Sequence, residues 1–283
     1  MRGMRGQGAL TALRRVDGET GTARAYLQGA TEVTVAGVAV VVDCDGAFYW
    51  PHEGVLAVAD LHLEKGSSFA ARGVPLPPYD TAATLARLVL RVGRCVPRTV
   101  IAQRQLSRPR WACPHGAAAD RAALVALQRG RDWIWIAGNH DPDPAIGIGG
   151  SFAPMLAIGA FIFRHQPSGG EGEIAGHRHP VATVRGRGRN VTRRCFASDG
   201  TRLVMPAFGA FAGGLNVRDR AFADVFGMLG FTVYMLGEGR TYVLAARRVL
   251  QIERSSHPAA RGATQTYKIW RGGTQVARLA LEP

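Results

Sequence analysis

Short apolar runs alternate with helix-like segments in the first half of the chain. Residues 31–50 are rich in valine and are interrupted by glycine and Asp-Gly, a pattern that predicts two or three adjoining strands. The run VLAVAD at 55–60 is typical of a buried strand, and TVIA at 99–102 and DWIWIAG at 132–138 predict two more. The segments YDTAATLARLVLRVGRC and AADRAALVALQRG lie between these strands and have helical periodicity. Strands that alternate with helices indicate an α/β fold.

The first helical segment has one apolar stripe. Its apolar side chains recur at helical spacing and are expected to share one face: Leu85, Leu88, Val89 and Val92. Asp80 precedes them and can act as the N-cap. The second helical segment is expected at residues 117–130.

The pattern changes to short strands after about residue 150. The stretches AFIFRH, GEIAGHRH and VTRRCFASDGTRLVMP each have strand character, and FTVYMLGEGRTYVL is typical of a hairpin. These strands predict a second sheet that packs face to face on the first, since each half alone leaves an apolar face uncovered. We expect an N-terminal extension at 1–30, one domain at 31–250 and a C-terminal tail of uncertain order at 251–283.

Composition excludes several classes of protein. Hydrophobic residues make up 47% of the 283 residues, and no apolar run approaches the roughly 20 residues of a membrane span. The start, MRGMRGQGALTALRR, lacks the apolar core of a secretory signal, so we expect a cytoplasmic protein with no membrane partner. The cysteines are far apart and form no CxxC pair, which argues against a zinc knuckle or a disulfide framework: Cys44, Cys95, Cys113 and Cys195.

The formal net charge of +14 favours a polyanionic partner such as nucleic acid. Only Lys65 and Lys268 are lysines, and the remaining basic residues are arginines alongside much alanine and glycine. A GC-rich genome produces the same bias, so the charge alone supports nucleic acid only modestly. The basic run at 186–194, preceded by Arg185, is typical either of a phosphate-binding segment or of a solvated hairpin edge.

Five of the eight histidines fall at the ends of predicted strands: His62, His140, His165, His177 and His179. Ligands of α/β proteins gather at the carboxyl ends of strands. Residues two apart on an extended chain point to the same side, so Asp60 and His62 can address one cation, as can His177 and His179. Either pair alone could be fortuitous. Histidine and carboxylate together favour Mn, Fe or Zn over Mg or Ca.

The order D-x-H, G-N-H-D, strand-end histidine and G-H-x-H resembles the calcineurin-like metallophosphoesterase superfamily. Within it, four stretches resemble the bacterial ligase-associated DNA damage response endonucleases: ADLHLEKGSSFAARG, WIWIAGNHDP, GEIAGHRHP and RRCFASDGTRLVMPAFGAFAGGLNV. The resemblance runs from about residue 31 to about 245 and includes every motif but one. The resemblance implies a four-layer α/β/β/α sandwich, DNA as substrate, and association with a DNA ligase or helicase.

The resemblance also implies a site with two divalent metal ions, Mn or alternatively Fe or Zn, that together activate water and neutralise charge on phosphate. One ion would be held by Asp60, His62 and His179, and the other by Asn139, His165 and His177. His140 would act on the leaving group, and Asp141 would orient His140. Lys65 and Arg72 follow the first motif and can hold substrate phosphate, or they are surface residues of a loop.

One motif of the family, G-D, is missing. Its aspartate bridges the two metals and should follow TVIA, where Gln103, Arg104 and Gln105 stand instead. The next acid, Asp120, begins a predicted helix, and His115 is a weak substitute. Loss of the bridge implies one metal or none.

Two explanations of this gap compete. Either the chain is a genuine variant, mononuclear or inert, or residues 103–117 derive from a shifted reading frame. We favour the second, because QRQLSRPRWACPHG has no periodicity and family-like sequence resumes abruptly at AADRAAL.

Three functions therefore compete. The first is a metal-dependent phosphoesterase that cleaves DNA phosphodiesters by two-metal hydrolysis during repair, with its activity in doubt because the bridging aspartate is absent. The second is a phosphoesterase for small molecules. The third is an inert nucleic-acid-binding protein that keeps the fold and the basic surface.

Overall fold

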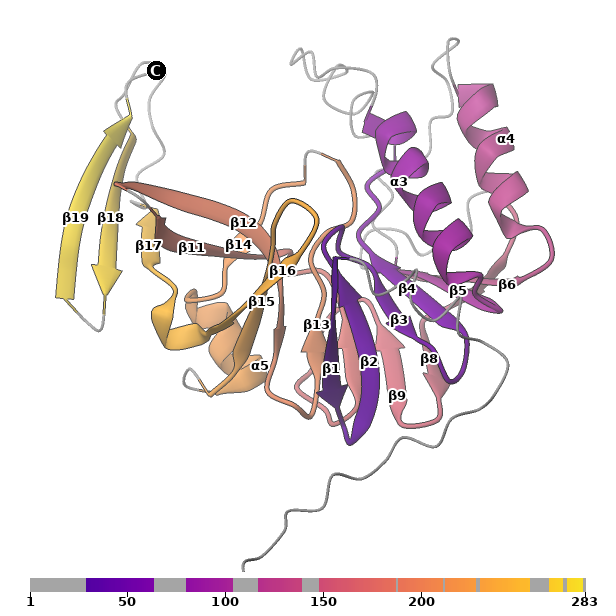
Figure 1. Cartoon of the computed structure of the whole chain (residues 1–283), viewed down its shortest axis with the longest axis horizontal. Helices are drawn as coiled ribbons and strands as arrows, with labels where there is room; N and C mark the ends of the chain where they lie inside the picture. The colour runs from indigo at the N-terminus through magenta and orange to yellow at the C-terminus, as the bar shows by residue number, and fades with distance from the viewer. Residues whose placement is uncertain are drawn as a thin grey trace, which may run out of the picture.

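The computed structural model is a mixed α/β protein with two large sheets and few helices in the residues it describes (Figure 1). These are residues 29–63, 80–103, 117–138, 148–186, 188–210, 212–227, 230–254, 265–271 and 274–281. None of the helices in these ranges is long and apolar enough to cross a membrane. The three cysteines within them, Cys44, Cys95 and Cys195, form no disulfide.

The first sheet has seven strands in sequence order. They are β1 (Ala30–Val35), β2 (Val38–Asp43), β3 (Phe48–Trp50), β4 (Val55–Ala59), β5 (Thr99–Gln103), β6 (Asp132–Ile136) and β7 (Ser151–Ala153). Neighbours from β1 to β4 are antiparallel, and those from β4 to β7 are parallel. This arrangement confirms the adjoining valine-rich strands and the three buried strands. The parallel strands have their carboxyl ends on one edge of the sheet.

The helices α3 (Asp80–Cys95) and α4 (Ala117–Gln128) cover one face of this sheet (Figure 1). Leu85, Leu88 and Val92 are buried there, together with Leu56 of β4. The prediction for Val89 was wrong, because its side chain is 48% exposed. One residue beyond Leu88 is a turn of about 100° around the helix, which carries Val89 away from the sheet. The side chain of Asp80 lies outside the described residues.

A charged residue joins the buried face of α3. Arg91 is 7% exposed, and its guanidinium lies 3.2 Å from Asp43 and 2.5 Å from Asp45. The polar pair ties α3 to the end of β2, and Asp43 also accepts the N–H groups of Gly46 and Ala47 in the turn before β3. The apolar pattern of the sequence therefore did not predict this ion pair, which is buried on the same face of α3.

The second half of the chain forms a second sheet, as expected, and this sheet has nine strands. Seven follow the order β14–β11–β12–β13–β10–β9–β8, and β15 pairs with both β12 and β16. The bounds are β8 (Met155–Ile158), β9 (Phe161–Arg164), β10 (Glu173–Ala175), β11 (Pro180–Gly186), β12 (Arg189–Ser198), β13 (Leu203–Val204), β14 (Leu215–Asn216), β15 (Thr232–Leu236) and β16 (Thr241–Ala245). The predicted hairpin at 231–244 is β15–β16.

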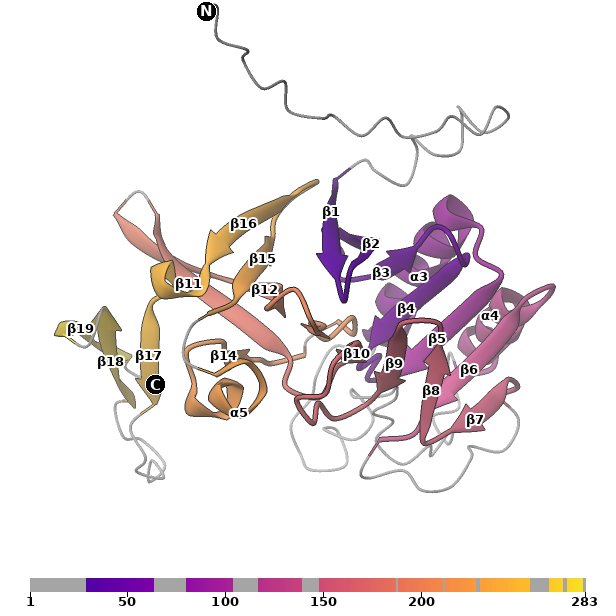
Figure 2. The same cartoon turned by 90° about the horizontal axis from the view of Figure 1, so that it is seen from below.

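The two sheets share one apolar layer. Figure 2 shows β8 and β9 of the second sheet beside the first sheet. Strand alternation decides which residues enter it: Leu56 and Val58 face the helices, whereas Ala57 and Ala59 face the second sheet. Phe48 meets Phe161 and Phe163 edge to face across this layer, at centroid distances of 5.8 and 5.9 Å. The short elements η1 (Arg220–Phe222) and α5 (Ala223–Phe226) pack in the core on the other face of the second sheet.

The C-terminal tail contains strands that sequence reasoning did not foresee. After the 3-10 turn η2 (Ala246–Arg248), β17 (Gln251–Arg254), β18 (Gln265–Arg271) and β19 (Thr274–Leu281) form a three-stranded antiparallel sheet. Figure 1 shows it at the end of the molecule away from α4. The limits of the three expected segments, 1–30, 31–250 and 251–283, stay predictions.

Candidate metal centre

Five of the predicted ligands come together where the two sheets meet. Asp60 and His62 follow β4, His165 follows β9, and His177 and His179 lie between β10 and β11. The main-chain N–H of His177 donates to Asp60 Oδ2 at 2.8 Å, which joins the first sheet to the second directly at the site. The carboxyl ends of strands from both sheets therefore converge on one place.

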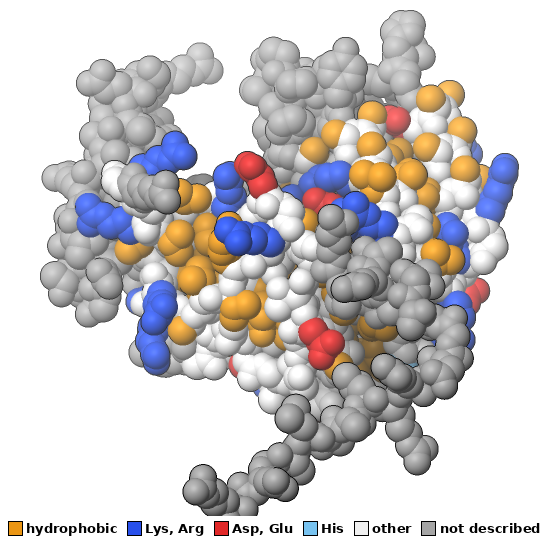
Figure 3. Space-filling model, viewed as in Figure 1, with side chains coloured by type: hydrophobic (Ala, Val, Ile, Leu, Met, Phe, Trp, Pro, Cys, Tyr) orange, Lys and Arg blue, Asp and Glu red, His pale blue; other side chains and the backbone are white. Residues whose placement is uncertain are grey.

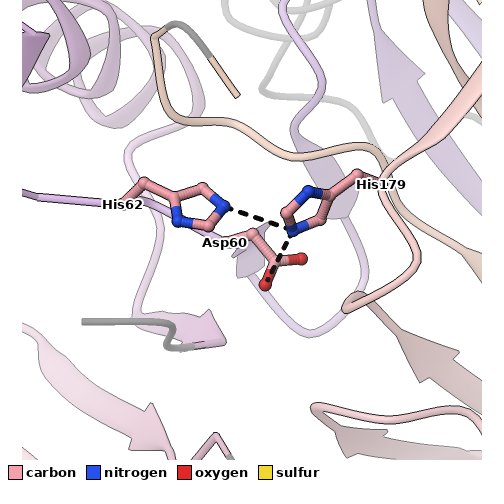
Figure 4. Close-up of side chains that lie close together, drawn as sticks. All are labelled: Asp60, His62 and His179. Carbon is pink, nitrogen blue, oxygen red and sulfur yellow. Dashed lines mark hydrogen bonds and ion pairs between the residues drawn. The ribbon is translucent and has the colours of Figure 1, made fainter. Parts of the chain in front are cut away.

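Asp60, His62 and His179 form a compact cluster (Figure 4). One ligand atom of each lies within 4.8 Å of the others. His62 Nε2 is 3.2 Å from His179 Nε2, and His179 Nε2 is 3.4 Å from Asp60 Oδ1. Two nitrogen ligands of a tetrahedral ion at 2.0–2.1 Å are roughly 3.3 Å apart. The cluster therefore fits a divalent cation, and it is the first ligand set that the resemblance implies.

His179 is oriented by a neighbour in the manner of a metal ligand. Its Nδ1 lies 3.1 Å from the carbonyl oxygen of Gly213, which can only accept a hydrogen bond. The Nδ1–H therefore donates to Gly213, and Nε2 faces Asp60 and His62. This outer contact fixes the orientation of the ring.

The second ligand set is described only in part. His165 Nε2 lies 3.0 Å from His177 Nδ1, and His165 Nδ1 lies 3.6 Å from Asp60 Oδ1. Asp60 Oδ1 thus contacts one histidine of each set. Asn139, the remaining member of the second set, lies outside the described residues. So do His140, Asp141, Lys65 and Arg72.

The carboxyl group of Asp60 is fully buried but stays ionised. Burial raises the pKa of Asp60, but the hydrogen bond from His179, the charges of His179 and His165 and the N–H of His177 together outweigh it. The pKa therefore lies below its ordinary value. An ionised carboxylate is the form that binds a cation.

Four of the five converging residues have left-handed main chain. The φ angles are 51° for Asp60, 47° for His62, 68° for His177 and 44° for His179. Residues other than glycine rarely adopt this region, at a cost of order 1–3 kcal/mol each. Such conformations persist only where neighbouring structure imposes them, and they cluster at functional sites. No signal in the sequence reports them.

The segment at 207–215 imposes part of this geometry. Phe208 N–H donates to Ala59 O at 2.7 Å, and Gly209 N–H donates to Asp60 O at 3.1 Å. Glycine is required at 209, since a methyl group there would lie 2.4 Å from Leu61 O. At the other end, Leu215 N–H donates to His179 O at 3.1 Å. The stretch PAFGAFAGGLNV, which carried the resemblance, thus supports the main chain of both Asp60 and His179.

A cavity of about 320 Å³ opens beside the centre. It is lined by His177, Arg178, His179, Gly213, Gly214 and Leu215. Arg178 brings a positive charge between the two histidines, and no carboxylate is among these lining residues. Sequence reasoning missed Arg178, although its signal was present as the variable position of G-H-x-H.

Comparison with known proteins bears on the fold. No protein-family model matches the sequence, and no curated protein matches it. Among solved structures, the chain is similar to the crystal structure of Pseudomonas putida nuclease MPE, with a TM-score of 0.59 and 25% sequence identity. The match covers 76% of this chain and 100% of that chain. The chain has a nuclease-like fold.

Gln103 occupies the end of β5, where the G-D motif was expected. Its side chain is fully buried, and its Nε2 donates to Ile174 O of β10 at 2.8 Å. Arg104, Gln105 and His115 lie outside the described residues. Asp120 is in the first turn of α4, as expected for a helix-terminal charge. The two explanations of the missing acid therefore stay open.

Proposed function

We propose that this protein is a metal-dependent phosphodiesterase of the calcineurin-like metallophosphoesterase type that cleaves DNA. The observation that carries the proposal is the convergence of Asp60, His62 and His179 at cation-binding distances in a chain with a nuclease-like fold. The arrangement of α3 and α4 outside one sheet and α5 outside the other supports the four-layer α/β/β/α description. A role in DNA repair beside a ligase or helicase rests on the resemblance alone.

Asp60, His62 and His179 would hold the principal cation. Two imidazoles and one carboxylate suit Mn, Fe or Zn. A divalent cation, when bound, supplies electrophilic activation of the phosphate ester and of the attacking water. His165 and His177, with Asn139, would hold a second cation. Asp60 is the single carboxylate among the described ligands, and this low negative charge favours occupancy by one cation over two.

The other residues of the centre bind and orient the substrate in this proposal. Arg178 lines the cavity beside both histidines, and its guanidinium presents a planar fork that matches two phosphate oxygens. His140 would donate a proton to the departing oxygen, and Asp141 would orient it. Lys65 and Arg72 would contact further phosphates of the strand.

The test compares hydrolysis of single-stranded DNA with that of small phosphate mono- and diesters, with Mn²⁺ and with a chelator. We expect chelator-sensitive cleavage of DNA that falls by at least about 100-fold in Asp60→Asn and His179→Ala. His52→Ala is the matched control, because the His52 side chain is 85% exposed and contacts the adjacent Glu53, while the bond from Arg98 goes to the main-chain carbonyl that alanine retains. Equal cleavage by Asp60→Asn and His52→Ala would refute the assignment. Small esters cleaved in place of DNA would indicate the small-molecule phosphoesterase.

Gln103 gives a specific reason to retain the inert binding protein as a second candidate. A neutral side chain stands at the end of β5, where the family has a metal-bridging carboxylate. In that case DNA binding would persist and weaken with salt, while no metal-dependent cleavage would occur under any of the assay conditions.

A further inference from the structure

Gln103 lies next to Asp60 at the edge of the first sheet. Its Cα pairs with that of Ala59, and its main-chain carbonyl accepts the N–H of Asp60 at 2.8 Å. Side chains alternate along β5, and Ile101, two residues earlier, belongs to the layer between the sheets. The Gln103 side chain therefore points into that layer, and the main chain holds it beside the metal centre.

The orientation of the Gln103 amide follows from its partner. Ile174 O lies 2.8 Å from Nε2 and can only accept a hydrogen bond, so the amide nitrogen must face β10. The amide oxygen, Oε1, is consequently directed elsewhere. Oε1 is fully buried and has no hydrogen-bond donor within the described part of the chain. A buried acceptor without a partner is unfavourable and calls for a physical explanation.

Gly176 shows what this oxygen faces. A methyl group added at Gly176 would lie 2.9 Å from Gln103 Oε1 and 2.6 Å from Asp60 Oδ2. Asp60 Oδ2 and Gln103 Oε1 therefore both lie close to Gly176, and a larger residue would collide with them there. Gly176 also donates its N–H to His165 O at 3.0 Å. Gln103 Oε1 therefore lies beside Gly176, which is close to three predicted ligands: Asp60, His165 and His177.

We infer that Gln103 supplies Oε1 as a neutral ligand to the cation held at Asp60, in place of the carboxylate missing from the end of β5. Amide oxygens are ordinary ligands of divalent cations. A neutral ligand completes a coordination shell but adds no charge to hold two cations together, which agrees with a centre occupied by one cation. The inference rests on the proposed function, because it requires that a cation binds at Asp60.

A purely structural role is the alternative. Gln103 would then only tether β10 to β5 through Nε2, and its oxygen would have no ligand. The two roles differ in what happens to cation binding when the oxygen is removed or charged, so cation affinity separates them without any assay of catalysis.

The experiment titrates the folded protein and its variants with Mn²⁺ by calorimetry and with Co²⁺ by visible absorption. Gln103→Leu removes the oxygen, and we expect its Kd for Mn²⁺ to rise about tenfold or more, with a changed Co²⁺ spectrum. Gln103→Glu places a second negative charge beside Asp60. Without a cation the two carboxylates repel, so added Mn²⁺ should raise the Tm of Gln103→Glu more than that of the wild type.

Gln128→Leu is the matched control. Gln128 of α4 donates its Nε2 to Ile148 O at 2.6 Å, so this variant loses the same kind of tether away from the metal centre. We expect it to lose stability and to keep the wild-type Kd and Co²⁺ spectrum. If Gln103→Leu does not fold, Gln103→Asn withdraws the oxygen by one methylene and should weaken binding in the same direction.

Two results would overturn the role of Gln103 but not the proposed function. The first is an unchanged Kd and Co²⁺ spectrum in Gln103→Leu. The second is a smaller Mn²⁺-dependent rise of the Tm in Gln103→Glu than in the wild type. In either case the wild type would still bind a cation that Asp60→Asn does not, and the proposed function would stand. A wild-type chain that binds no cation would overturn both.

Discussion

In the proposed function, Arg178 binds a phosphate group of the substrate beside the metal centre. It lies between two predicted ligands, lines the cavity beside them, and brings a positive charge to a place without a carboxylate among its lining residues. A charge-assisted hydrogen bond to phosphate is stronger than a neutral one. Substrate affinity should therefore depend on Arg178, while the cation should bind without it.

We expect Arg178→Gln to raise the KM for a phosphodiester by roughly 10- to 100-fold and to weaken inhibition by inorganic phosphate similarly. Steady-state kinetics with a soluble diester measures both, and the Kd for Mn²⁺ should stay at the wild-type value. Arg178→Lys should recover only part of the affinity, since lysine has no fork. A KM unchanged in Arg178→Gln would show that the side chain does not contact substrate.

Glu173 holds the loop that follows His165. Its carboxylate accepts Ser168 N–H and Gly169 N–H at 2.9 Å each, and Arg164 at 2.9 Å. Burial raises the pKa of Glu173, but the hydrogen bonds from Ser168, Arg164 and Gly169 outweigh it and hold the pKa below the ordinary 4.5. The folded state thus favours the ionised form. This stabilisation is present above the unfolded pKa and is lost as the pH falls through the folded pKa.

Glu173→Gln should therefore cost about 1–3 kcal/mol in the free energy of unfolding at neutral pH, and the deficit should shrink as the pH falls through the lowered pKa of Glu173. Denaturant unfolding at neutral pH and at an acidic pH below 4.5 measures the difference. Glu171→Gln is the control, since Glu171 is exposed two residues earlier. A deficit of equal size at both pH values would mean that the charge of Glu173 is not what stabilises the loop.

At the scale of elements, the segment at 207–215 connects β4, α3 and β11. Beyond its bonds to Ala59 and Asp60, Ala210 N–H donates to Thr84 of α3 at 3.0 Å, and Arg87 of α3 donates to Phe208 O at 2.6 Å. These contacts place the segment against the left-handed main chain at Asp60 and His62. Its sequence is therefore constrained by the metal centre as well as by packing.

Gly209→Ala should destabilise the fold by about 1–3 kcal/mol, because its methyl group would collide with Leu61 O, and it should weaken cation binding by displacing Asp60. Gly230→Ala is the control away from the metal centre, since a methyl group there has no neighbour within 4 Å. Thermal unfolding and Mn²⁺ titration of both variants test this. Wild-type behaviour of Gly209→Ala would show that the segment does not hold Asp60 in place.

The local sequence pattern was sufficient to predict most strands and helices, but it did not predict the contacts between them. The valine-rich strands, the buried strands of the first sheet and the β15–β16 hairpin were all predictable, because alternation and turn residues are local signals. Val89 was misplaced, since apolar character alone does not set the limit of the buried face, and Arg91, which pairs with Asp43, lies on that face instead. The tail strands were missed because β18 and β19 have polar breaks. The bond from His177 to Asp60 joins residues 117 positions apart, which no local pattern encodes.

At the scale of the whole molecule, positive charge dominates the sequence. The run at 185–194 forms the β11–β12 hairpin, with Arg185, Arg189 and Arg193 exposed. Figure 3 shows basic side chains around an apolar patch on the face that carries β12, β15 and β16. Strand β11 begins directly after His179, so the hairpin extends from the metal centre. In the proposed function, we expect a DNA strand bound at the centre to follow this hairpin.

We expect the double variant Arg185→Ala and Arg193→Ala to weaken DNA binding uniformly across sequences. The slope of log K against log salt should fall by about 1.4 to 1.8, the value for two lost phosphate contacts. Fluorescence anisotropy over a range of salt concentrations measures this. Arg248→Ala is a single-charge control at an exposed arginine of the 3-10 turn η2, where we expect little change. An unchanged slope in the double variant would identify the run as a solvated hairpin edge.

The most direct test is the cation content of the folded chain. The wild type and Asp60→Asn would be loaded with Mn²⁺, freed of unbound metal and measured for metal per chain, with circular dichroism to verify that both are folded. We expect bound Mn²⁺ in the wild type and its loss in Asp60→Asn, because Asp60 contributes the buried negative charge of the centre. A folded wild type without metal, or an Asp60→Asn chain that retains it, would refute the metal centre.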